Sequence, residues 1–122
     1  MDKKLNPDFY FKDDRGKLIQ LVHEGVEQIN VLVSNKGVHR GGHYHTKSIE
    51  SFFVISGSVE VTIHDKEGNG VDTHTFRPDD YFCIEPGEAH SMYFPEDCTM
   101  VVMYDKWIEA TGEKDIHPAE GC

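Results

Sequence analysis

The chain has 122 residues and a formal net charge of −10, with 22 acidic and 12 basic side chains. That acidity argues against a nucleic-acid partner, which would require a basic face to neutralise phosphates. No apolar run approaches the roughly 18 residues of a membrane-spanning helix, and the first residues lack the apolar segment of a signal peptide. We therefore expect a single domain over residues 1–122, with no membrane partner and a cytoplasmic location.

Short segments of alternating apolar residues, separated by turn formers, recur along the whole chain. The predicted strands are 18–22, 28–34, 52–56, 58–64, 72–76, 81–84, 90–94 and 99–104, with one more strand carrying histidines after Gly37. Short strands at this regular spacing are typical of an all-β sandwich or barrel. We expect the barrel to span about residues 14–105, with a turn-rich loop at 65–70 and a polar tail at 110–122.

Two groups of aromatic residues lie outside these predicted strands. Near the N-terminus, Phe9, Tyr10 and Phe11 are expected to cover an edge strand, with contact to a partner subunit as the alternative. After the last predicted strand, the tail at 105–122 has two interpretations. It adds an edge strand or wraps a neighbouring subunit through Trp107, or it is partly disordered beyond Thr111. We expect a packed Trp107 and a loose end.

One stretch combines metal-ligand residue types. Because side chains alternate faces along a strand, His43 and His45 should point the same way. Glu50 follows a polar turn and begins an apolar run, which we predict to be the paired strand of a hairpin. His90 follows a tight turn at Pro86 that would aim it toward the same interior. Three neutral imidazoles and one carboxylate suit Fe, Mn, Ni, Zn or Cu as a divalent ion, with open positions for water or substrate.

This stretch resembles the first cupin motif, Gly-x5-His-x-His-x4-Glu-x6-Gly. The matching residues are Gly37, His43, His45, Glu50 and Gly57. The second cupin motif, Gly-x5-Pro-x-Gly-x2-His-x3-Asn, is matched in part. Gly87 and His90 are in place, whereas Asp79, Glu85 and Phe94 stand where the motif has Gly, Pro and Asn.

The resemblance implies a cupin-type double-stranded β-helix, a jelly-roll barrel of antiparallel strands. It also implies a divalent transition metal held by His43, His45, Glu50 and His90, a small-molecule ligand in the barrel, and a homodimer.

A second resemblance concerns substrate class. The residues Asp14-Arg15-Gly16-x-Leu18, then Gln28-Ile29-Asn30 and Arg40-Gly41-Gly42-His43, are similar to the opening run of the RmlC-like cupins. These include dTDP-4-dehydrorhamnose 3,5-epimerases, dTDP-sugar 3,4-ketoisomerases and the cupin domain attached to capsular-polysaccharide reductases. In those epimerases and ketoisomerases, the residue matching His43 is a base that removes a proton next to the sugar ketone. Arg40 corresponds to an arginine near the substrate, so His43 and Arg40 are the candidate catalytic residues.

The two roles of His43 compete, because a nitrogen bound to a metal has no free lone pair to accept a proton. The complete set of four ligand residues favours metal binding. The first hypothesis is a metal-dependent isomerase or epimerase of a carbohydrate or sugar nucleotide, with Arg15, Lys36, Arg40 and Lys47 as possible sources of positive charge for a phosphate. The alternatives are an Fe(II)-dependent dioxygenase and a non-catalytic metal or small-ligand binding module.

Overall fold

The computed structural model describes residues 4–64, 70–107 and 117–118, and every regular element in these ranges is a β-strand. The strands are β1 (Phe9–Asp13), β2 (Gly16–Gln20), β3 (Gln28–Ser34), β4 (His39–Tyr44), β5 (Glu50–Ser56), β6 (Val59–His64), β7 (Gly70–Phe76), β8 (Tyr81–Ile84), β9 (Ala89–Tyr93), β10 (Cys98–Tyr104) and β11 (His117–Pro118). Within these ranges, no helix has the length and apolar character to cross a membrane.

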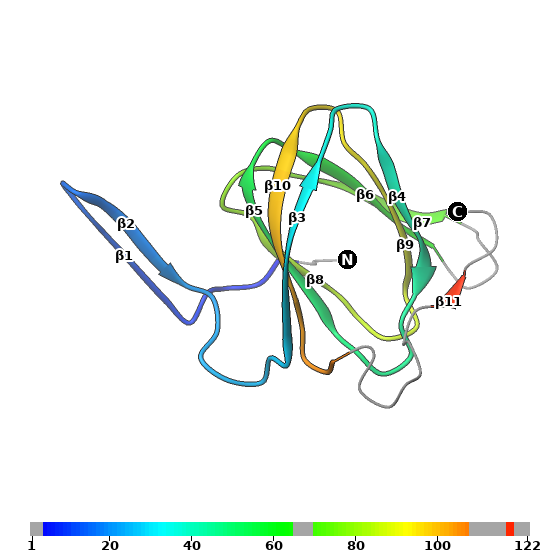
Figure 1. The fold of residues 1–122 in the computed structure, drawn as a ribbon, viewed down its shortest axis with the longest axis horizontal. Coiled ribbons are helices and arrows are strands. Elements are labelled where there is room, and N and C mark those ends of the chain that lie inside the picture. The colour runs from blue at the N-terminus through cyan, green and yellow to red at the C-terminus, as the bar shows by residue number, and fades with distance from the viewer. Residues whose placement is uncertain (1–3, 65–69, 108–116, 119–122) are drawn as a thin grey trace.

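Two antiparallel sheets face each other and form the barrel (Figure 1). One has the strand order β3-β10-β5-β8 and the other β11-β4-β9-β6-β7. The chain crosses repeatedly between the sheets, because β3 and β5 lie in the first whereas β4 and β6 lie in the second. This topology confirms the predicted cupin-type jelly roll of antiparallel strands.

The core lies between the two sheets and is centred on stacked aromatic rings. Phe82 stacks on Phe76, with ring centroids 3.8 Å apart, and on Phe52 at 4.8 Å. The inward positions of β6 are Val59, Val61 and Ile63, as its strict alternation predicts. Burial of this apolar surface is the main driving force that closes the two sheets.

The predicted strand bounds agree with the structure for β3 and β8, and the bounds of most other strands differ by one or two residues. β1 was not predicted as a strand. β11 lies at the edge of its sheet, in agreement with the alternative in which the tail adds an edge strand. The predicted loop at 65–70 lies outside the described residues except for Gly70, which begins β7. The predicted polar tail at 110–122 also lies outside them, except for the two residues of β11, which pair with β4.

Strands β1 and β2 form a separate two-stranded hairpin that extends away from the barrel (Figure 1). The prediction that Phe9, Tyr10 and Phe11 cover an edge of their own barrel is therefore wrong, since each side chain is about half exposed. The prediction of a packed Trp107 is also wrong, because its side chain is 51% exposed and its backbone N–H donates to Glu27. Aromatic character alone did not distinguish buried residues from exposed ones at the chain ends.

The turn before β8 shows how the chain accommodates its departure from the second cupin motif. Asp79 stands at the motif's glycine position and has φ of 73°, in the left-handed region that favours glycine. Aspartate tolerates this conformation better than most residues. The backbone N–H of Asp79 donates to the carbonyl of Val54 at 2.8 Å, which ties the turn to β5.

Gly57, the last glycine of the first motif, closes the turn between β5 and β6. Its φ is +80°, and an added Cβ would collide with the carbonyl oxygen of Asp97 and lie 2.8 Å from Cα of Cys98. Glycine is required here both for its backbone conformation and for the close approach of another chain segment. Gly37 has a similar φ of +87°, but an added Cβ there would meet open space.

Substituting each glycine by alanine separates these two requirements. We expect Gly37→Ala to lower the free energy of unfolding by about 1–2 kcal/mol, the cost of a left-handed alanine. Gly57→Ala should cost roughly 1–3 kcal/mol more, because the backbone of Asp97 and Cys98 must also move. Urea unfolding of both variants measures the difference. Equal losses of unfolding free energy in the two variants would show that the close approach of Asp97 and Cys98 to Gly57 adds no cost to the substitution.

Candidate metal centre and ligand cavity

A β-bulge in β4 determines which way His43 points. In the register between β4 and β9, Gly41 is opposite Ser91 and His43 is opposite His90, so Gly42 is an extra residue between them. In a regular strand, His43 would lie on the same face as Gly41, away from the interior. One inserted residue reverses this alternation, and His43 therefore points inward with His90. Arg40 is opposite the buried Met92 and shares that inward face.

The glycine at the bulge is required by the backbone of the neighbouring strand. Gly41 has φ of +99°, and a Cβ there would lie 2.6 Å from the carbonyl oxygen of His90. Next along the chain, His45 follows the end of β4, and its carbonyl accepts a hydrogen bond from the backbone N–H of Gly87 at 2.6 Å. This bond links the end of β4 to the turn that precedes His90, so the three histidines are held together by backbone contacts.

The structure corrects the predicted position of Glu50. We expected Glu50 on a strand that pairs with the histidine strand in a hairpin. Instead, β5 pairs with β10 and β8, whereas β4 pairs with β9 and β11. The segment between them crosses from one sheet to the other, and Ser48 within it is buried. Glu50 therefore approaches the imidazoles from the facing sheet, across the interior.

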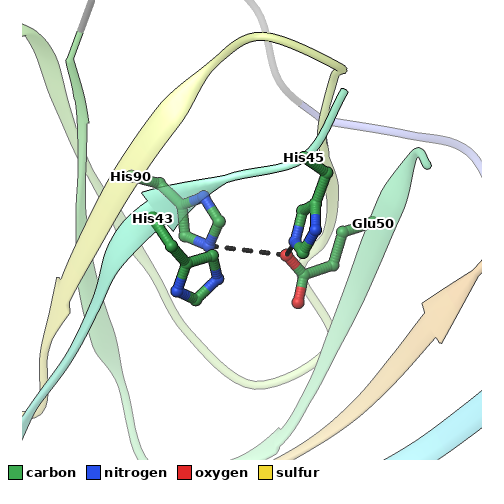
Figure 2. Close-up of side chains that lie close together, drawn as sticks. All are labelled: His43, His45, Glu50 and His90. Atoms are coloured by element: carbon green, nitrogen blue, oxygen red, sulfur yellow. Dashed lines mark hydrogen bonds and ion pairs between the residues drawn. The ribbon is translucent and has the colours of Figure 1, made fainter. Parts of the chain in front are cut away.

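Figure 2 shows the four side chains pointing toward one another. One possible ligand atom from each of His43, His45, Glu50 and His90 lies within 4.8 Å of the others. Oε1 of Glu50 is 3.1 Å from Nε2 of His45 and 3.4 Å from Nε2 of His90. The rings of His43 and His90 meet edge to face, with centroids 4.5 Å apart.

Burial keeps the imidazoles of His43 and His90 neutral. Desolvation lowers the pKa of His90 to about 4, and neighbouring histidines add to this shift although Glu50 opposes it. Desolvation is also the largest cause of the lowered pKa of His43, which is only partly buried. Neutral imidazole is the form that offers a lone pair to a metal ion.

Glu50 stays ionised because polar partners surround it. Burial by itself would raise the pKa of this carboxyl, which is only 4% exposed. Hydrogen bonding and charge interactions with His45 and His90, together with the Tyr104 hydroxyl, outweigh that effect and lower the pKa. Tyr104 donates to Oε2 of Glu50 at 2.8 Å. Burial and the carboxylate both raise the pKa of Tyr104, so the hydroxyl keeps its proton.

The donor set fits a divalent transition metal. His90 is fully buried, and its Nε2 makes no hydrogen bond to any described residue. An unsatisfied nitrogen at this depth costs free energy unless it has another use, and a metal bond is one such use. Three neutral nitrogens with one carboxylate are the ligands that Zn, Fe, Mn, Ni and Cu accept.

A cavity of about 220 Å³ opens beside the cluster. Its lining residues are Asn30, Leu32, Arg40, Gly41, His43, Glu50, Met92, Val102 and Tyr104. Of the cluster, only His43 and Glu50 line the cavity. The cavity therefore reaches the cluster on one side, where open coordination positions would be accessible.

Arg40 is the basic residue of this cavity. Its Nε donates to Oγ of the buried Ser34 at 2.9 Å, and its terminal nitrogen donates to the carbonyl of Val33 at 3.3 Å. Arg15, Lys36 and Lys47, the other predicted sources of positive charge, do not line it.

Sequence reasoning missed Tyr104. The sequence contains a signal for its inward position, because Met100, Val102 and Tyr104 occupy every second position of β10 and therefore share one face. The predicted strand did not show that β10 would pair with β5 so that Tyr104 lies opposite Glu50. The other described histidines lie outside the cluster; for example, the ring of His39 lies tilted beside that of Tyr93, with centroids 4.8 Å apart, and His64 contacts Ser91.

The family model described as "Polysaccharide biosynthesis C-terminal domain" matches residues 11–117. A comparison with curated proteins gives no match.

Solved structures share the fold at low sequence identity. The capsular polysaccharide assembling protein CapF from Staphylococcus aureus is 19% identical, with a TM-score of 0.63, over 92% of this chain and 34% of that one. A double mutant of the QdtA 3,4-ketoisomerase from Thermoanaerobacterium thermosaccharolyticum, in complex with TDP, is 21% identical, with a TM-score of 0.72, over 91% and 83%. The epimerase RmlC from Legionella pneumophila, in complex with dTDP-4-keto-L-rhamnose, is 21% identical, with a TM-score of 0.69, over 84% and 65%.

The chain spans about a third of the length of CapF and most of the length of the ketoisomerase. Its match to the family model covers most of its own residues. The chain therefore belongs to the family of polysaccharide biosynthesis C-terminal domains, and its fold is that of an RmlC-like cupin.

Proposed function

We propose that this protein binds a divalent transition metal through His43, His45, Glu50 and His90 and acts as an isomerase or epimerase of a carbohydrate, with a nucleotide-linked keto-sugar as the substrate class. The observation that carries the proposal is the buried cluster of four donors beside a cavity whose wall includes Arg40. The likeness to a ketoisomerase bound to TDP and an epimerase bound to a dTDP-keto-sugar supports the substrate class. We propose further that the protein is a homodimer.

The cavity limits what part of such a ligand can enter. Pockets for drug-sized ligands are roughly 300–1,000 Å³, and this cavity of about 220 Å³ is smaller. It suits one sugar ring, with the nucleotide portion outside the barrel. Arg40 would then meet a phosphate that links the two portions, because guanidinium groups bind phosphate oxygens in a bidentate manner.

The residues around the cavity have separate chemical roles. A bound divalent ion would supply a Lewis acid that polarises the carbonyl of the sugar. His43 is a metal ligand in this proposal, so the coordinating nitrogen does not remove a proton from the substrate. The proton next to the ketone would instead pass to a water molecule in the cavity, which returns a solvent proton to carbon. Tyr104 holds Oε2 of Glu50 by a hydrogen bond, which leaves Oε1 on the side of the imidazoles.

Elemental analysis of protein purified without chelator tests the metal site first. We expect about one divalent ion per chain in the native protein, as in other sites built from protein ligands. His90→Ala should lose most of the ion, whereas His23→Ala, which removes an exposed histidine outside the cluster, should retain it. His43→Ala distinguishes the two roles of that residue, since full retention of the ion would assign His43 as a free base.

Finding no metal after divalent ions are added back would contradict the ligand assignment. Iron, together with oxygen consumption on turnover, would favour the dioxygenase alternative over the isomerase.

Removing the hydroxyl of Tyr104 tests its role as a positioning residue. Loss of a hydrogen bond to a metal ligand typically costs about 10- to 100-fold in metal affinity, and we expect Tyr104→Phe to do the same. Competition with a chelator measures this change without any substrate. Tyr93→Phe, on a partly buried tyrosine whose ring lies beside that of His39, is the matched control. Equal affinity in both variants would show that Glu50 needs no orientation by Tyr104.

Hydrogen exchange tests the reaction class. With dTDP-4-keto-L-rhamnose in deuterated water, the native protein should replace a proton next to the ketone by deuterium, detected by NMR. Arg40→Met should weaken binding of TDP and of the sugar nucleotide, whereas Lys36→Met should not, because Lys36 does not line the cavity. Binding of TDP without exchange would support the non-catalytic alternative for this ligand.

A further inference from the structure

Ser34 is a polar residue at a buried position of β3, next to the cavity. Asn30 and Leu32 line the cavity, and Ser34 shares their face because side chains two residues apart point the same way. Ser34 is only 2% exposed. A buried hydroxyl costs free energy unless it has a hydrogen-bond partner, so the identity of that partner indicates what the serine does.

The partner is Arg40, and in the described part of the chain the Ser34 hydroxyl has no other. Nε of Arg40 donates to Oγ of Ser34 at 2.9 Å. The pairing of β3 with β10, in which Ser34 lies opposite Cys98, uses backbone groups and does not require the hydroxyl. The Ser34 hydroxyl therefore acts on the side chain of Arg40 rather than on the pairing of the barrel strands.

Arg40 brings a positive charge to the cavity wall. Elsewhere, Lys4, Arg15 and Lys17 each form an ion pair with an aspartate. Among the residues that the structure describes, no carboxylate forms an ion pair with Arg40. In a protein with a net charge of −10, a cavity-lining guanidinium without an acidic partner indicates an anionic ligand.

The two hydrogen bonds of Arg40 occupy one edge of its guanidinium group. Nε binds Ser34, and Nη2 donates to the carbonyl of Val33 at 3.3 Å. Nε and Nη2 form the side edge of the planar group, so the end edge formed by Nη1 and Nη2 keeps one N–H on each nitrogen. Because these two N–H groups are parallel, the end edge can bind two oxygens of one phosphoryl group.

The contact with Ser34 also affects the entropy of binding. Arg40 is exposed, and an exposed arginine samples many rotamers that ligand binding must restrict. A hydrogen bond to a buried hydroxyl restricts these rotamers before the ligand arrives, because the serine itself is held by packing. Less conformational entropy is then lost when the ligand binds.

We propose that Ser34 is a positioning residue, which holds the side edge of Arg40 so that the end edge binds one phosphoryl group of the ligand. The inference rests on the proposed function, because it takes a nucleotide-linked sugar as the ligand. Ser34 acts through Arg40 and does not contact the ligand itself. Loss of its hydroxyl therefore weakens ligand binding while the charge of Arg40 and the metal site stay in place.

Calorimetric titration with TDP tests this role. Ser34→Ala should raise the Kd for TDP roughly 3- to 10-fold, the effect of one side chain that is no longer ordered in advance. Ser58→Ala is the matched control, because the buried Ser58 donates to Glu96 at 2.9 Å and does not line the cavity. The control should bind TDP as the native protein does. Native affinity in Ser34→Ala would overturn the proposal.

A double-mutant cycle distinguishes positioning from a structural role. In an Arg40→Met background, Ser34→Ala should leave the Kd for TDP unchanged, because the side chain through which it acts is gone. An equal loss of affinity in both backgrounds would show that Ser34 acts independently of Arg40, and would overturn the proposal. Metal content and thermal unfolding check the barrel. Ser34→Cys, which keeps a similar volume with a weak acceptor, replaces Ser34→Ala if the latter loses cooperative unfolding.

An NMR measurement without ligand separates this inference from the proposed function. The Nε–H of Arg40, assigned by its absence in Arg40→Met, should exchange with solvent roughly 10-fold faster in Ser34→Ala than in the native protein. Equal exchange rates in the two proteins would overturn the positioning role, whatever TDP does. The expected difference in rates, in a native protein that does not bind TDP, would confirm the contact and overturn the nucleotide as ligand, which is a failure of the proposed function.

Discussion

The buried carboxylate of Glu50 is the constraint on which the interior of this barrel depends. Removing an ionised carboxyl from water costs several kcal/mol unless polar partners surround it. Here the partners are His45 at the end of β4, His90 in β9 and Tyr104 in β10, while Glu50 itself begins β5. These elements belong to both sheets. The two sheets must therefore meet in one relative position for the charge to be compensated, so the polar cluster specifies the geometry that the apolar core stabilises.

The interior changes from polar to apolar between two successive inward residues of β5. Glu50 and Phe52 are successive inward residues, and Phe52 belongs to the aromatic stack with Phe82. The ring of Phe52 also contacts that of His90 edge to face, at 6.4 Å. Aromatic rings thus exclude water from one side of the cluster, while the other side opens to the cavity. Electrostatic interactions are stronger where water is excluded, so this arrangement suits a site that must polarise a ligand.

Much of the fold was predictable because its signals are local. Strict alternation predicted β6 with its inward face, and the spacing of His43, His45, Glu50 and His90 predicted that they would meet. The errors arose where pairing between distant strands decides the outcome. Whether β4 pairs with β5 depends on the topology of the whole barrel, and the hairpin expected from proximity in sequence was wrong. The inward role of Tyr104 depended on a register that local patterns do not contain.

The exposed aromatics of the hairpin formed by β1 and β2 illustrate a related limit. Composition indicates that Phe9, Tyr10 and Phe11 need an apolar environment, but it does not say which surface provides it. Their own barrel does not, according to the structure. Apolar residues that are buried against another surface give the same sequence pattern as apolar residues of a core. In both cases the side chains are removed from water, and the sequence does not show what covers them.

The bulge at Gly42 gives the site an unusual genetic property. The bulge absorbs Gly42 as an unpaired residue, so Gly41 stays opposite Ser91 and His43 stays opposite His90. Loss of that single codon would make β4 regular, with His43 directly after Gly41, still opposite His90 and still pointing inward. The segment can therefore differ by one residue without turning the imidazole away from the site. Among distant relatives, the identities of the four ligand residues, rather than the length of this short segment, record whether the site is in use.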